Sequence, residues 1–391
     1  MSEVYWLLLG KLTVENCRKI RYNIGYQKLN RHRGQIKMKK EKKQSTKRTV
    51  LIVVCIVLGI VLAALIGATA FTKYLLGRIN YAGAAIQPTL SQEEIDAIEN
   101  ASDETVSPEE TAPEVNEEDI IWSDVDATIG GDDIVNIMLI GQDRRPGEDR
   151  ARSDSMILVT FNKTKKTITM TSFMRDLYVK IPGGYKDNRI NTSYSLGGME
   201  LLDETLFVNF GVEVDANVEV DFDQFEHIID LLGGVEIELD EAEAKYINKK
   251  MNTRNVQAGL QTLNGKQALW YARNRSTGGT SDFGRTNRQR TVLNALIEAY
   301  KNKPITEMIG LLDDILPLIT TDLEQNEILS YVVTLFPLLA DSEIVTQHIP
   351  VQGGYYDATI RGMQVLVPNM DVNRQALIDS LTNGEALEET E

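Results

Sequence analysis

The chain has 391 residues, a formal net charge of −16 and two cysteines. The charge is unevenly divided, because 16 Lys and Arg face 3 Asp and Glu up to Arg78, whereas 25 face 54 from Ile79 onward. An acidic globular part argues against a general nucleic-acid binder. Cys17 and Cys55 both precede that part, which excludes an intramolecular disulfide within it, and three scattered histidines argue against a histidine triad or a zinc site.

The N-terminal region combines a basic stretch with a long apolar run. Residues 1–49 are predicted to form a basic cytoplasmic segment, and Val50–Phe71 is free of charge. At 1.5 Å per residue, 22 residues span roughly 33 Å, enough to cross a bilayer. We therefore expect one transmembrane helix over residues 50–72, a single-pass protein of the cell membrane, and everything after Lys73 outside the cytoplasm.

Two alternatives concern this region. A cleaved signal peptide would use the small residues Ala68-Thr69-Ala70, although the apolar run is longer than an ordinary signal-peptide core. Met38 begins the basic sequence MKKEKKQSTKR, an ordinary start for such an anchor. Residues 1–37 are therefore hypothesised to result from a start assigned too far upstream, with the native chain beginning at Met38. N-terminal sequencing of the native protein would decide the second point.

Residues 73–133 are interpreted as an acidic, largely disordered stalk. From Ile79 to Asp133 there is no Lys or Arg, while acidic residues are frequent. Within it, Ser91–Asn100 is predicted to form a short helix with Ser91 as N-cap. A catalytic domain is expected over residues 134–382, followed by an acidic tail over 383–391.

The domain opens with three strand-like runs, Asn136–Ile140, Met156–Phe161 and Thr167–Ser172. Charged residues follow the first and third runs and precede the second; they include Asp143, Arg152, Asp154 and the pair Arg175-Asp176. Charged side chains just past the ends of buried strands are where open α/β sheets bind ligands. The pattern favours an extracytoplasmic phosphate-handling site.

The following elements alternate between helix and strand. A Gly/Asn-rich connection, Ile181–Gly198, precedes a predicted helix, Met199–Phe210, that Gly211 ends. The further elements expected are strands at Val212–Val214, Asn217–Val220, Val235–Leu239 and Glu343–Ile349, and helices at Asp221–Leu232, Lys266–Arg275 and Glu327–Leu339. His227, in the helix Asp221–Leu232, is interpreted as a packing or surface residue.

A further helix is expected in the segment FGRTNRQRTVLNALIEAYK. On it, Arg285, Arg288 and Gln289 share a face with Val292 and Leu296, so basic groups cap one end of an apolar stripe. An anionic head group could bind at the N-terminus of this helix, where backbone donors and the helix dipole favour anions.

Carboxylates and arginines together suggest a metal-bound polyanion. Asp143 and Asp154 offer the oxygen ligands that Mg²⁺ or Mn²⁺ prefers, with a phosphate sharing the metal. Arginines recur at the ends of elements and suit a diphosphate; they are Arg152, Arg175, Arg189, Arg273, Arg275, Arg285 and Arg288. The alternative is that these charges form ordinary salt bridges on a solvated surface. The motifs GxxxxGK[ST], GxSxG and HExxH are absent, which argues against an ATP site, a serine hydrolase and a zinc protease.

Seven motifs in order resemble the LytR-CpsA-Psr family from about Ile134 to Lys301. They are NIMLIGQDRR, RSDSMILVTFN, SFMRDLYV, RINTSYSLGG, VDFDQFEHIIDLLGGVEIEL, LNGKQALWYARNR and SDFGRTNRQR. The family comprises membrane-anchored bacterial enzymes that move glycopolymers from a polyprenyl (pyro)phosphate carrier to the cell wall. The resemblance implies an α/β fold, a three-layer α-β-α domain with a central mixed sheet that encloses an apolar tunnel for the polyprenyl tail.

The resemblance also implies residue roles. Asp143 and Asp154 would hold Mg²⁺, with Mn²⁺ as a possible substitute. The pyrophosphate would be held by Arg152, Arg175, Arg273, Arg275 and Arg285, with Gln289 at the same site and Arg288 in support. Four of these, Arg152, Arg175, Arg273 and Arg275, are expected to act in catalysis, while the role of Arg189 is less defined.

The implied reaction is a phosphoryl transfer from a polyprenyl-pyrophosphate-linked glycan to peptidoglycan. A hydroxyl of the acceptor attacks the sugar-linked phosphate and polyprenyl phosphate leaves, with Asp176 or Asp282 as candidate base. Two alternatives stay open: a polyprenyl-pyrophosphate phosphatase, and a non-enzymatic regulatory or adhesion protein that binds wall polymer. The sequence does not distinguish teichoic acid from capsule or another polysaccharide.

Overall fold

The computed structural model describes a large part of the chain after Thr72. The chain divides into two units, Met1–Thr72 and Lys73–Glu391. The described residues all belong to the second unit; they are 77, 80–81, 90–101, 112–142, 153–277, 281–301, 314–323, 327–328, 330–331, 334–335, 338–339 and 342–384.

A mixed seven-stranded sheet lies at the centre of this described part. From edge to edge its strands are β1 (Asn80–Tyr81), β10 (Thr320–Thr321), β7 (Ala216–Asp221), β2 (Ile134–Gln142), β3 (Ser153–Asn162), β4 (Thr167–Phe173) and β11 (Glu343–Ile349). Neighbours pair in parallel at β1–β10, β7–β2 and β4–β11, and antiparallel at β10–β7, β2–β3 and β3–β4. The predicted mixed sheet is therefore confirmed.

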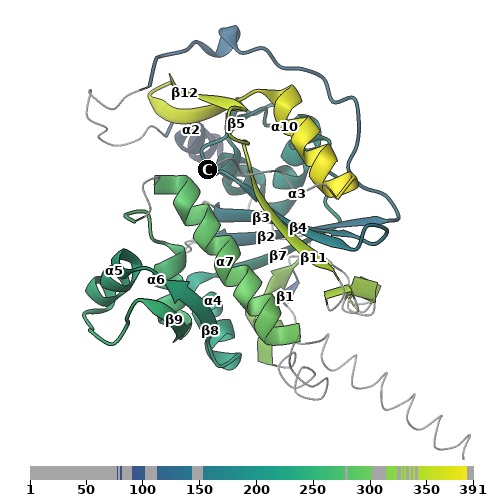
Figure 1. The fold of residues 1–391 in the computed structure, drawn as a ribbon. Coiled ribbons are helices and arrows are strands. Elements are labelled where there is room, and N and C mark those ends of the chain that lie inside the picture. The colour runs from purple at the N-terminus through teal and green to yellow at the C-terminus, as the bar shows by residue number, and fades with distance from the viewer. Residues whose placement is uncertain are drawn as a thin grey trace, which may run out of the picture. The chain divides into compact units, whose positions relative to one another are not determined.

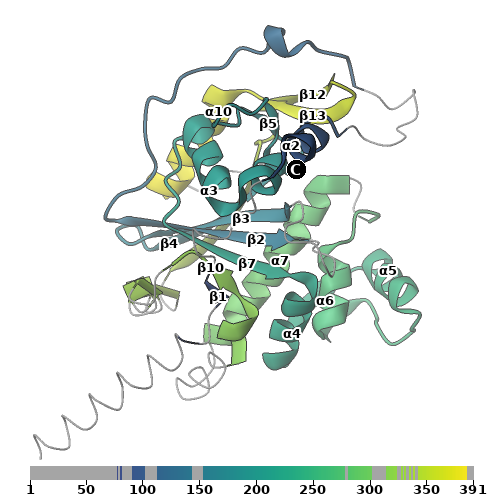
Figure 2. The same cartoon turned by 180° about the vertical axis from the view of Figure 1, so that it is seen from behind.

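Helices cover both faces of the sheet, which makes three layers (Figure 1 and, from behind, Figure 2). On one face lie α3 (Ile190–Phe210) and α10 (Met370–Leu377), and on the other lies α7 (Ser281–Lys301). Because both faces are covered, β3 and β4 are almost continuously buried, including the threonines of β4.

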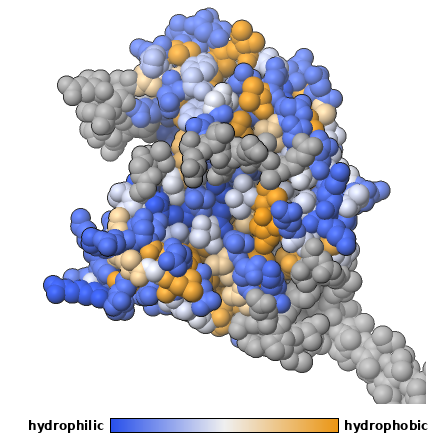
Figure 3. Space-filling view, viewed as in Figure 1, coloured by the Kyte–Doolittle hydropathy of each residue, from blue (hydrophilic) through white to orange (hydrophobic). Residues whose placement is uncertain are grey.

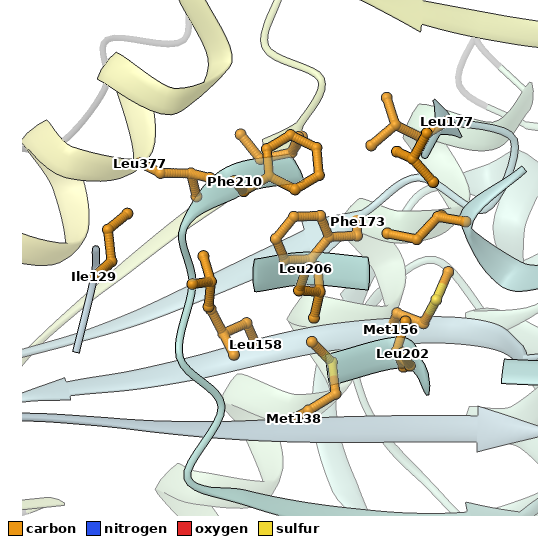
Figure 4. Packing of buried hydrophobic residues seen from close by; sticks show 14 of the residues in the cluster. Ile129, Met138, Met156, Leu158, Phe173, Leu177, Leu202, Leu206, Phe210 and Leu377 are labelled. Atoms are coloured by element: carbon orange, nitrogen blue, oxygen red, sulfur yellow. The ribbon is translucent and has the colours of Figure 1, made fainter. Parts of the chain in front are cut away.

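Alternate residues of the strands supply two separate cores. Met138 and Leu158 point toward α3, where they pack with Leu202, Leu206 and Phe210 (Figure 4). The intervening residues of the same strands face α7, with Ile157 and Val159 in one cluster with Leu293 and Ile297. This period of two is the one that strand geometry requires.

A smaller group of elements packs against α7 beside the sheet. Its members are α4 (Phe222–Leu231), β8 (Val235–Leu239), α5 (Glu241–Met251), β9 (Gly259–Leu263) and α6 (Gly265–Ala272). Their common core contains Ile237, Ile247 and Val292. α4 and α6 approach closely, because a Cβ at Gly265 would lie 2.0 Å from the carbonyl oxygen of Glu226.

Short elements complete the layer that contains α3 and α10. They are α2 (Gln92–Glu99), a 3₁₀ turn (Glu117–Asp119), β5 (Tyr178–Val179), β6 (Asn188–Arg189), the hairpin β12 (Tyr355–Ile360) and β13 (Met363–Pro368), and a π-helical turn (Ile378–Thr382). A second 3₁₀ turn, Leu316–Leu318, precedes β10.

The described part of the predicted stalk packs on the domain. α2 begins at the predicted N-cap, Ser91, which forms a capping box with Glu94. Ile129 is 1% exposed in the main core, and Trp122 packs against the same cluster. The helix predicted at Ser91–Asn100 therefore forms as α2, and residues 112–133 are ordered as well, with Ile129 and Trp122 held by contacts distant in sequence.

Several element boundaries differ from prediction. The connection Ile181–Gly198 is partly helical, since α3 begins at Ile190 and only changes direction at Gly198, where φ is 68° and ψ −149°. A glycine in this conformation kinks a helix without ending it. The predicted strand Val212–Val214 is reduced to a single bridge between Val212 and Ile129.

The predicted membrane span, residues 50–72, lies outside the described residues. Among the residues that the structure describes, no helix is long and apolar enough to cross a bilayer. The acidic tail from residue 385 also lies outside them.

Candidate functional site

The ends of several strands lie together on one side of the central sheet, at the C-terminal ends of β2, β4 and β7. β2 and β4 end there, at Gln142 and Phe173, and the antiparallel β3 begins there at Ser153. β7 runs parallel to β2 and ends at the same edge with Asp221, the N-cap of α4. The charged residues that the sequence places beyond these strands are therefore brought together at one edge.

On the sheet side of the site, Arg175 lies between two carboxylates. Its Nη1 is 3.5 Å from Oδ1 of Asp154, at the start of β3, and its Nε donates to Oδ2 of Asp176 at 3.2 Å. Arg189, at the end of β6, places Nη1 3.6 Å from the other oxygen of Asp176. Four charged groups, from β3, the turn after β4 and β6, thus form one chain.

A second group of charges comes from the C-terminal half of the domain. Asp282 lies in the first turn of α7. Its Oδ1 forms ion pairs with Nη1 of Arg285 at 3.0 Å and with Nε of Arg275 at 3.4 Å. Arg275 follows α6 and is exposed. Arg275 and Arg285, both expected to hold the pyrophosphate, therefore meet at one carboxylate.

Electrostatic effects join the two groups. Burial raises the pKa of Asp282, and Arg275 and Arg175 oppose this effect. Burial by itself would lower the pKa of Arg175, but Asp176, Asp282 and Asp154 together outweigh it and raise the pKa. Because Arg175 and Asp282 influence each other, the sheet side and the helix side form a single site.

Arg285 is the most buried of the expected pyrophosphate ligands. It is 3% exposed, and among the residues that the structure describes it forms an ion pair with Asp282, while Nε, Nη1 and Nη2 make no hydrogen bond there. A buried guanidinium with unused donors is unfavourable unless an anion satisfies it. Its surroundings therefore suit a bound phosphate group.

An apolar cavity of about 260 Å³ opens beside these charges, between the sheet and α4, α6 and α7. Its walls are mostly aliphatic and aromatic; they include Leu139, Ile157, Val218, Val220, Phe222, Phe225, Ile228, Leu269, Leu293 and Leu296. Polar atoms come from Ser155, Asp221, Arg273 and Gln289. Such a cavity suits a ligand whose apolar chain lies inside it and whose polar end lies at its mouth.

Arg273 and Gln289 lie where the cavity meets the charged groups. The guanidinium carbon of Arg273 is 4.2 Å from the ring centre of Phe222 and 5.5 Å from that of Trp270, which fixes it between two aromatic faces. The amide oxygen of Gln289 is buried and makes no hydrogen bond. Both residues line the cavity.

Arg288 has a different environment from its neighbours. Nε donates to Glu243 Oε1 at 2.7 Å, Nη1 to the carbonyl oxygen of Asn274 at 3.3 Å, and Nη2 to two atoms of Thr277 at 2.8 Å each. These contacts hold α5 and the segment after Arg273 against α7. The geometry assigns Arg288 a supporting position rather than direct contact with a ligand.

Two of the predicted site residues, Asp143 and Arg152, lie outside the described residues. Asp154, the other expected metal ligand, has a side chain 28% exposed, and its pairing with Arg175 at 3.5 Å leaves oxygen lone pairs available. In the described ranges, no three Asp, Glu, His or Cys side chains gather as metal ligands would.

Sequence reasoning missed two buried partners. Glu243 pairs with Arg288 and also completes the capping box of α5. Arg290 is 2% exposed, and its Nη1 donates to Ser172 on β4 at 3.0 Å, which ties α7 to the sheet. Its place in TNRQR gave no local signal. His227 is exposed, in agreement with the prediction that it is a packing or surface residue.

Comparison with known proteins gives consistent matches. The model of the LytR_cpsA_psr family matches residues 93–378. The regulatory protein MsrR of Staphylococcus aureus (strain COL) is 31% identical over 257 residues, which cover 65% of this chain and 76% of MsrR. The polyisoprenyl-teichoic acid–peptidoglycan teichoic acid transferase TagT of Bacillus subtilis (strain 168) is 36% identical over 234 residues, 58% of this chain and 70% of TagT.

A solved structure shares the fold. It is the LytR-CPS2A-psr family protein YwtF (TagT) with bound octaprenyl pyrophosphate lipid. The two superpose with a TM-score of 0.50 at 28% identity, over 65% of this chain and 90% of that one.

Proposed function

The chain belongs to the LytR-CpsA-Psr family, and from this we propose that it transfers a glycopolymer from a polyprenyl-pyrophosphate carrier to peptidoglycan. The polymer is a teichoic acid, a capsule or a related polysaccharide. Support comes from TagT, which is named as a teichoic acid transferase, and from the related structure that contains octaprenyl pyrophosphate.

The observation that carries the proposal is the position of Arg285. Its buried, unsatisfied guanidinium lies beside Asp282 and Arg275, and Gln289, one turn further along α7, lines the apolar cavity. A prenyl chain in the cavity would place its pyrophosphate among Arg175, Arg275 and Arg285, with Arg273 at the cavity wall. Arg152 is proposed to join them.

These residues would act by positioning and by neutralising charge. A hydroxyl oxygen of the acceptor bonds to the sugar-linked phosphorus, and the bond from that phosphorus to the bridging oxygen breaks. Polyprenyl monophosphate leaves with the bridging oxygen, and the hydroxyl proton goes to a carboxylate. Arginines aimed at the phosphate oxygens stabilise the charge on the transferring and departing groups.

Asp282 is the better candidate for the carboxylate that accepts the proton. Burial raises its pKa, which makes it a stronger base than an ordinary carboxylate. Both carboxylates pair with two arginines, Asp176 with Arg175 and Arg189 and Asp282 with Arg275 and Arg285, so the raised pKa is what favours Asp282.

Asp143 and Asp154 are proposed to hold Mg²⁺, or Mn²⁺ in its place. When bound, the ion would supply positive charge to the pyrophosphate oxygens. Residues 50–72 are proposed to anchor the domain in the cell membrane, with residues 1–49 in the cytoplasm and the site facing the wall; the charge-free run Val50–Phe71 supports this.

A transfer assay tests the proposal. The full-length chain is incubated with a prenyl-pyrophosphate-linked glycan labelled in the sugar, peptidoglycan and Mg²⁺, and label attached to peptidoglycan is measured. Attachment that is lost with a chelator and restored by Mg²⁺ or Mn²⁺ is expected. If attachment persists in the presence of the chelator, the proposed metal dependence is wrong, whereas the proposed transfer reaction still holds.

Two other functions give different results in the same assay. Free phosphorylated glycan without attachment would indicate a phosphatase. Binding of the donor without cleavage would indicate a regulatory protein, a possibility kept open by the name of the relative MsrR.

A further inference from the structure

One segment of the domain departs from its acidic composition. From residue 244 to residue 281 there are seven Lys and Arg and no Asp or Glu, although acidic residues outnumber basic ones by 54 to 25 after Arg78. The segment covers most of α5, all of β9 and α6, and the residues that lead to α7. In the view of Figure 3 the edge of the molecule over α5 is largely hydrophilic, with apolar residues beside it.

On this segment, aromatic and basic side chains form a layered group. The ammonium nitrogen of Lys250 lies 5.5 Å from the ring centre of Tyr246 and 5.3 Å from that of Trp270. Lys249 is exposed next to it, in the last turn of α5. We call Tyr246, Lys249, Lys250 and Trp270 the α5–α6 surface.

The α5–α6 surface is continuous with the site described above. Trp270 contacts Lys250 and, at 5.5 Å, the guanidinium of Arg273, which lines the cavity. The hydroxyl of Tyr246 interacts electrostatically with arginines of the same site. Burial raises the pKa of Tyr246, and the charges of Arg273, Arg275 and Arg288 oppose this effect. Trp270 therefore links the α5–α6 surface to Arg273 at the cavity wall.

We propose that the α5–α6 surface binds the anionic chain of the donor glycan in the units next to the pyrophosphate. The inference rests on the proposed function, and it adds that the donor carries phosphate or carboxylate groups along its chain. Lys249 and Lys250 supply compact positive charges for such groups. Tyr246 and Trp270 hold Lys250 in place, and each is partly exposed.

Neighbouring acidic residues favour a glycan chain over an anionic bilayer as the partner. Glu236 and Glu238 are exposed on β8, and the exposed Leu260 pairs in register with Glu238. Glu241 is exposed one turn before Lys245. These carboxylates would be repelled by an extended anionic surface, whereas a single chain can pass over Lys249 and Lys250 alone.

The test compares three ligands and three chains. The ligands are geranylgeranyl pyrophosphate, the same lipid carrying a neutral N-acetylated disaccharide, and that disaccharide extended by glycerol phosphate units. The chains are the full-length protein, its Lys250→Glu variant and, as matched control, Lys165→Glu, an exposed lysine on the β3–β4 turn at the opposite end of those strands. Dissociation constants are measured in phosphatidylcholine vesicles and in vesicles containing phosphatidylglycerol.

The unaltered chain and Lys165→Glu are expected to bind the phosphate-bearing ligand at least about threefold more tightly than the neutral one, with the preference falling at high salt. Lys250→Glu should lose this preference in both vesicles while its affinity for geranylgeranyl pyrophosphate is unchanged. Lys250→Gln should show an intermediate loss, which separates the lost charge from the introduced one.

Three results would overturn the inference. They are equal affinity of the unaltered chain for the neutral and anionic glycans, an equal loss for all three ligands in Lys250→Glu, and an effect confined to phosphatidylglycerol vesicles. The last would indicate a membrane contact. If geranylgeranyl pyrophosphate itself does not bind, the proposed function fails and this inference with it; if it binds without any preference, the inference alone fails.

Discussion

Arg285 and Arg288 lie one turn apart on α7, and both are buried. Arg288 uses its nitrogens in four hydrogen bonds, one of them to the buried carboxylate of Glu243. Within the described part of the chain, Arg285 makes no hydrogen bond and forms an ion pair with Asp282. Arginine therefore stabilises the fold at position 288, whereas at position 285 its donors are available to bind an anion.

Replacement of Arg285 should separate affinity from stability. Arg285→Met removes a cation that binds the pyrophosphate, so we expect affinity for geranylgeranyl pyrophosphate to fall about 10- to 100-fold. The free energy of unfolding without ligand should change by no more than about 1 kcal/mol, because the lost guanidinium had no hydrogen bonds and Asp282 keeps Arg275. Calorimetric titration and urea unfolding measure the two effects; a large loss of stability with unchanged affinity would contradict the assignment.

Replacement of Arg288 should have the opposite signature. Arg288→Met leaves Glu243 buried without its partner and should lower the free energy of unfolding by about 3–5 kcal/mol. The double variant Arg288→Met with Glu243→Gln should recover much of that loss, because the uncompensated charge is gone. Urea unfolding of the set checks this. A stable Arg288→Met that has lost ligand affinity would instead make Arg288 a direct ligand.

At the scale of elements, α3 is joined to the sheet through a pair of carboxylates. The side-chain amide of Asn217 on β7 donates to Asp203 of α3 and to Asp322, which follows β10, at 2.7 Å each. Burial, together with the charges of Asp322 and Glu200, raises the pKa of Asp203 to about 8, and the hydrogen bond from Asn217 only partly opposes this. The junction is therefore most favourable when Asp203 is protonated.

This junction predicts a pH dependence of stability. The pKa of Asp203 is raised in the folded state, so the folded state binds the proton more tightly than the unfolded one, and stability falls as pH rises from about 4 to about 8. Asp203→Asn removes this contribution, which amounts to at most about 1.4 kcal/mol per pH unit in that range. As the pH rises from about 4 to about 8, the Asp203→Asn variant should gain stability relative to the unaltered chain, and below about pH 4 the difference between the two should stay constant. A parallel pH profile for both chains would contradict the prediction.

Much of the element order was predictable from local pattern. The strands Val235–Leu239 and Glu343–Ile349 have the predicted bounds, because their flanking turns are clear in the sequence. The first half of α3 was missed since Gly197 and Gly198 resemble a stop, although only Gly198 has positive φ. Local glycine content does not reveal whether a helix ends or bends.

The site was predictable in its residue types but not in its pairings. The recurring arginines and the acidic background pointed to Arg175, Arg275 and Arg285, and the structure brings these together. The partners Glu243 and Ser172 were not predictable, because they approach from 45 and 118 residues away. Contacts at such distances in the chain depend on the fold and leave no local pattern.

At the scale of the whole molecule, the segment before β2 belongs to the packed structure. Arg374 on α10 donates to the carbonyl oxygens of Ser123 and Asp124 at 3.0 and 2.7 Å, and Ile129 is enclosed by the main core. Glu99, at the end of α2, accepts from the backbone of Lys186 at 2.9 Å.

A chain that begins at Ile134 should therefore be less stable than one that begins at Lys73. Loss of Ile129 alone removes about 1.5–3 kcal/mol of apolar burial, and Arg374 loses its hydrogen bonds to Ser123 and Asp124. Thermal unfolding of the two truncated chains measures the difference. Equal melting temperatures would show that the segment does not contribute to stability.

The central claim is that the site transfers the polymer to a glycan hydroxyl rather than to water. Donor, peptidoglycan and the full-length chain are incubated in water enriched in ¹⁸O, and the isotope content of the polymer-linked phosphate is measured by mass spectrometry. Transfer predicts a phosphate that joins polymer to peptidoglycan and contains no solvent oxygen, with one polyprenyl monophosphate released per linkage. One solvent oxygen in the phosphate of each released polymer, without linkage, would contradict it.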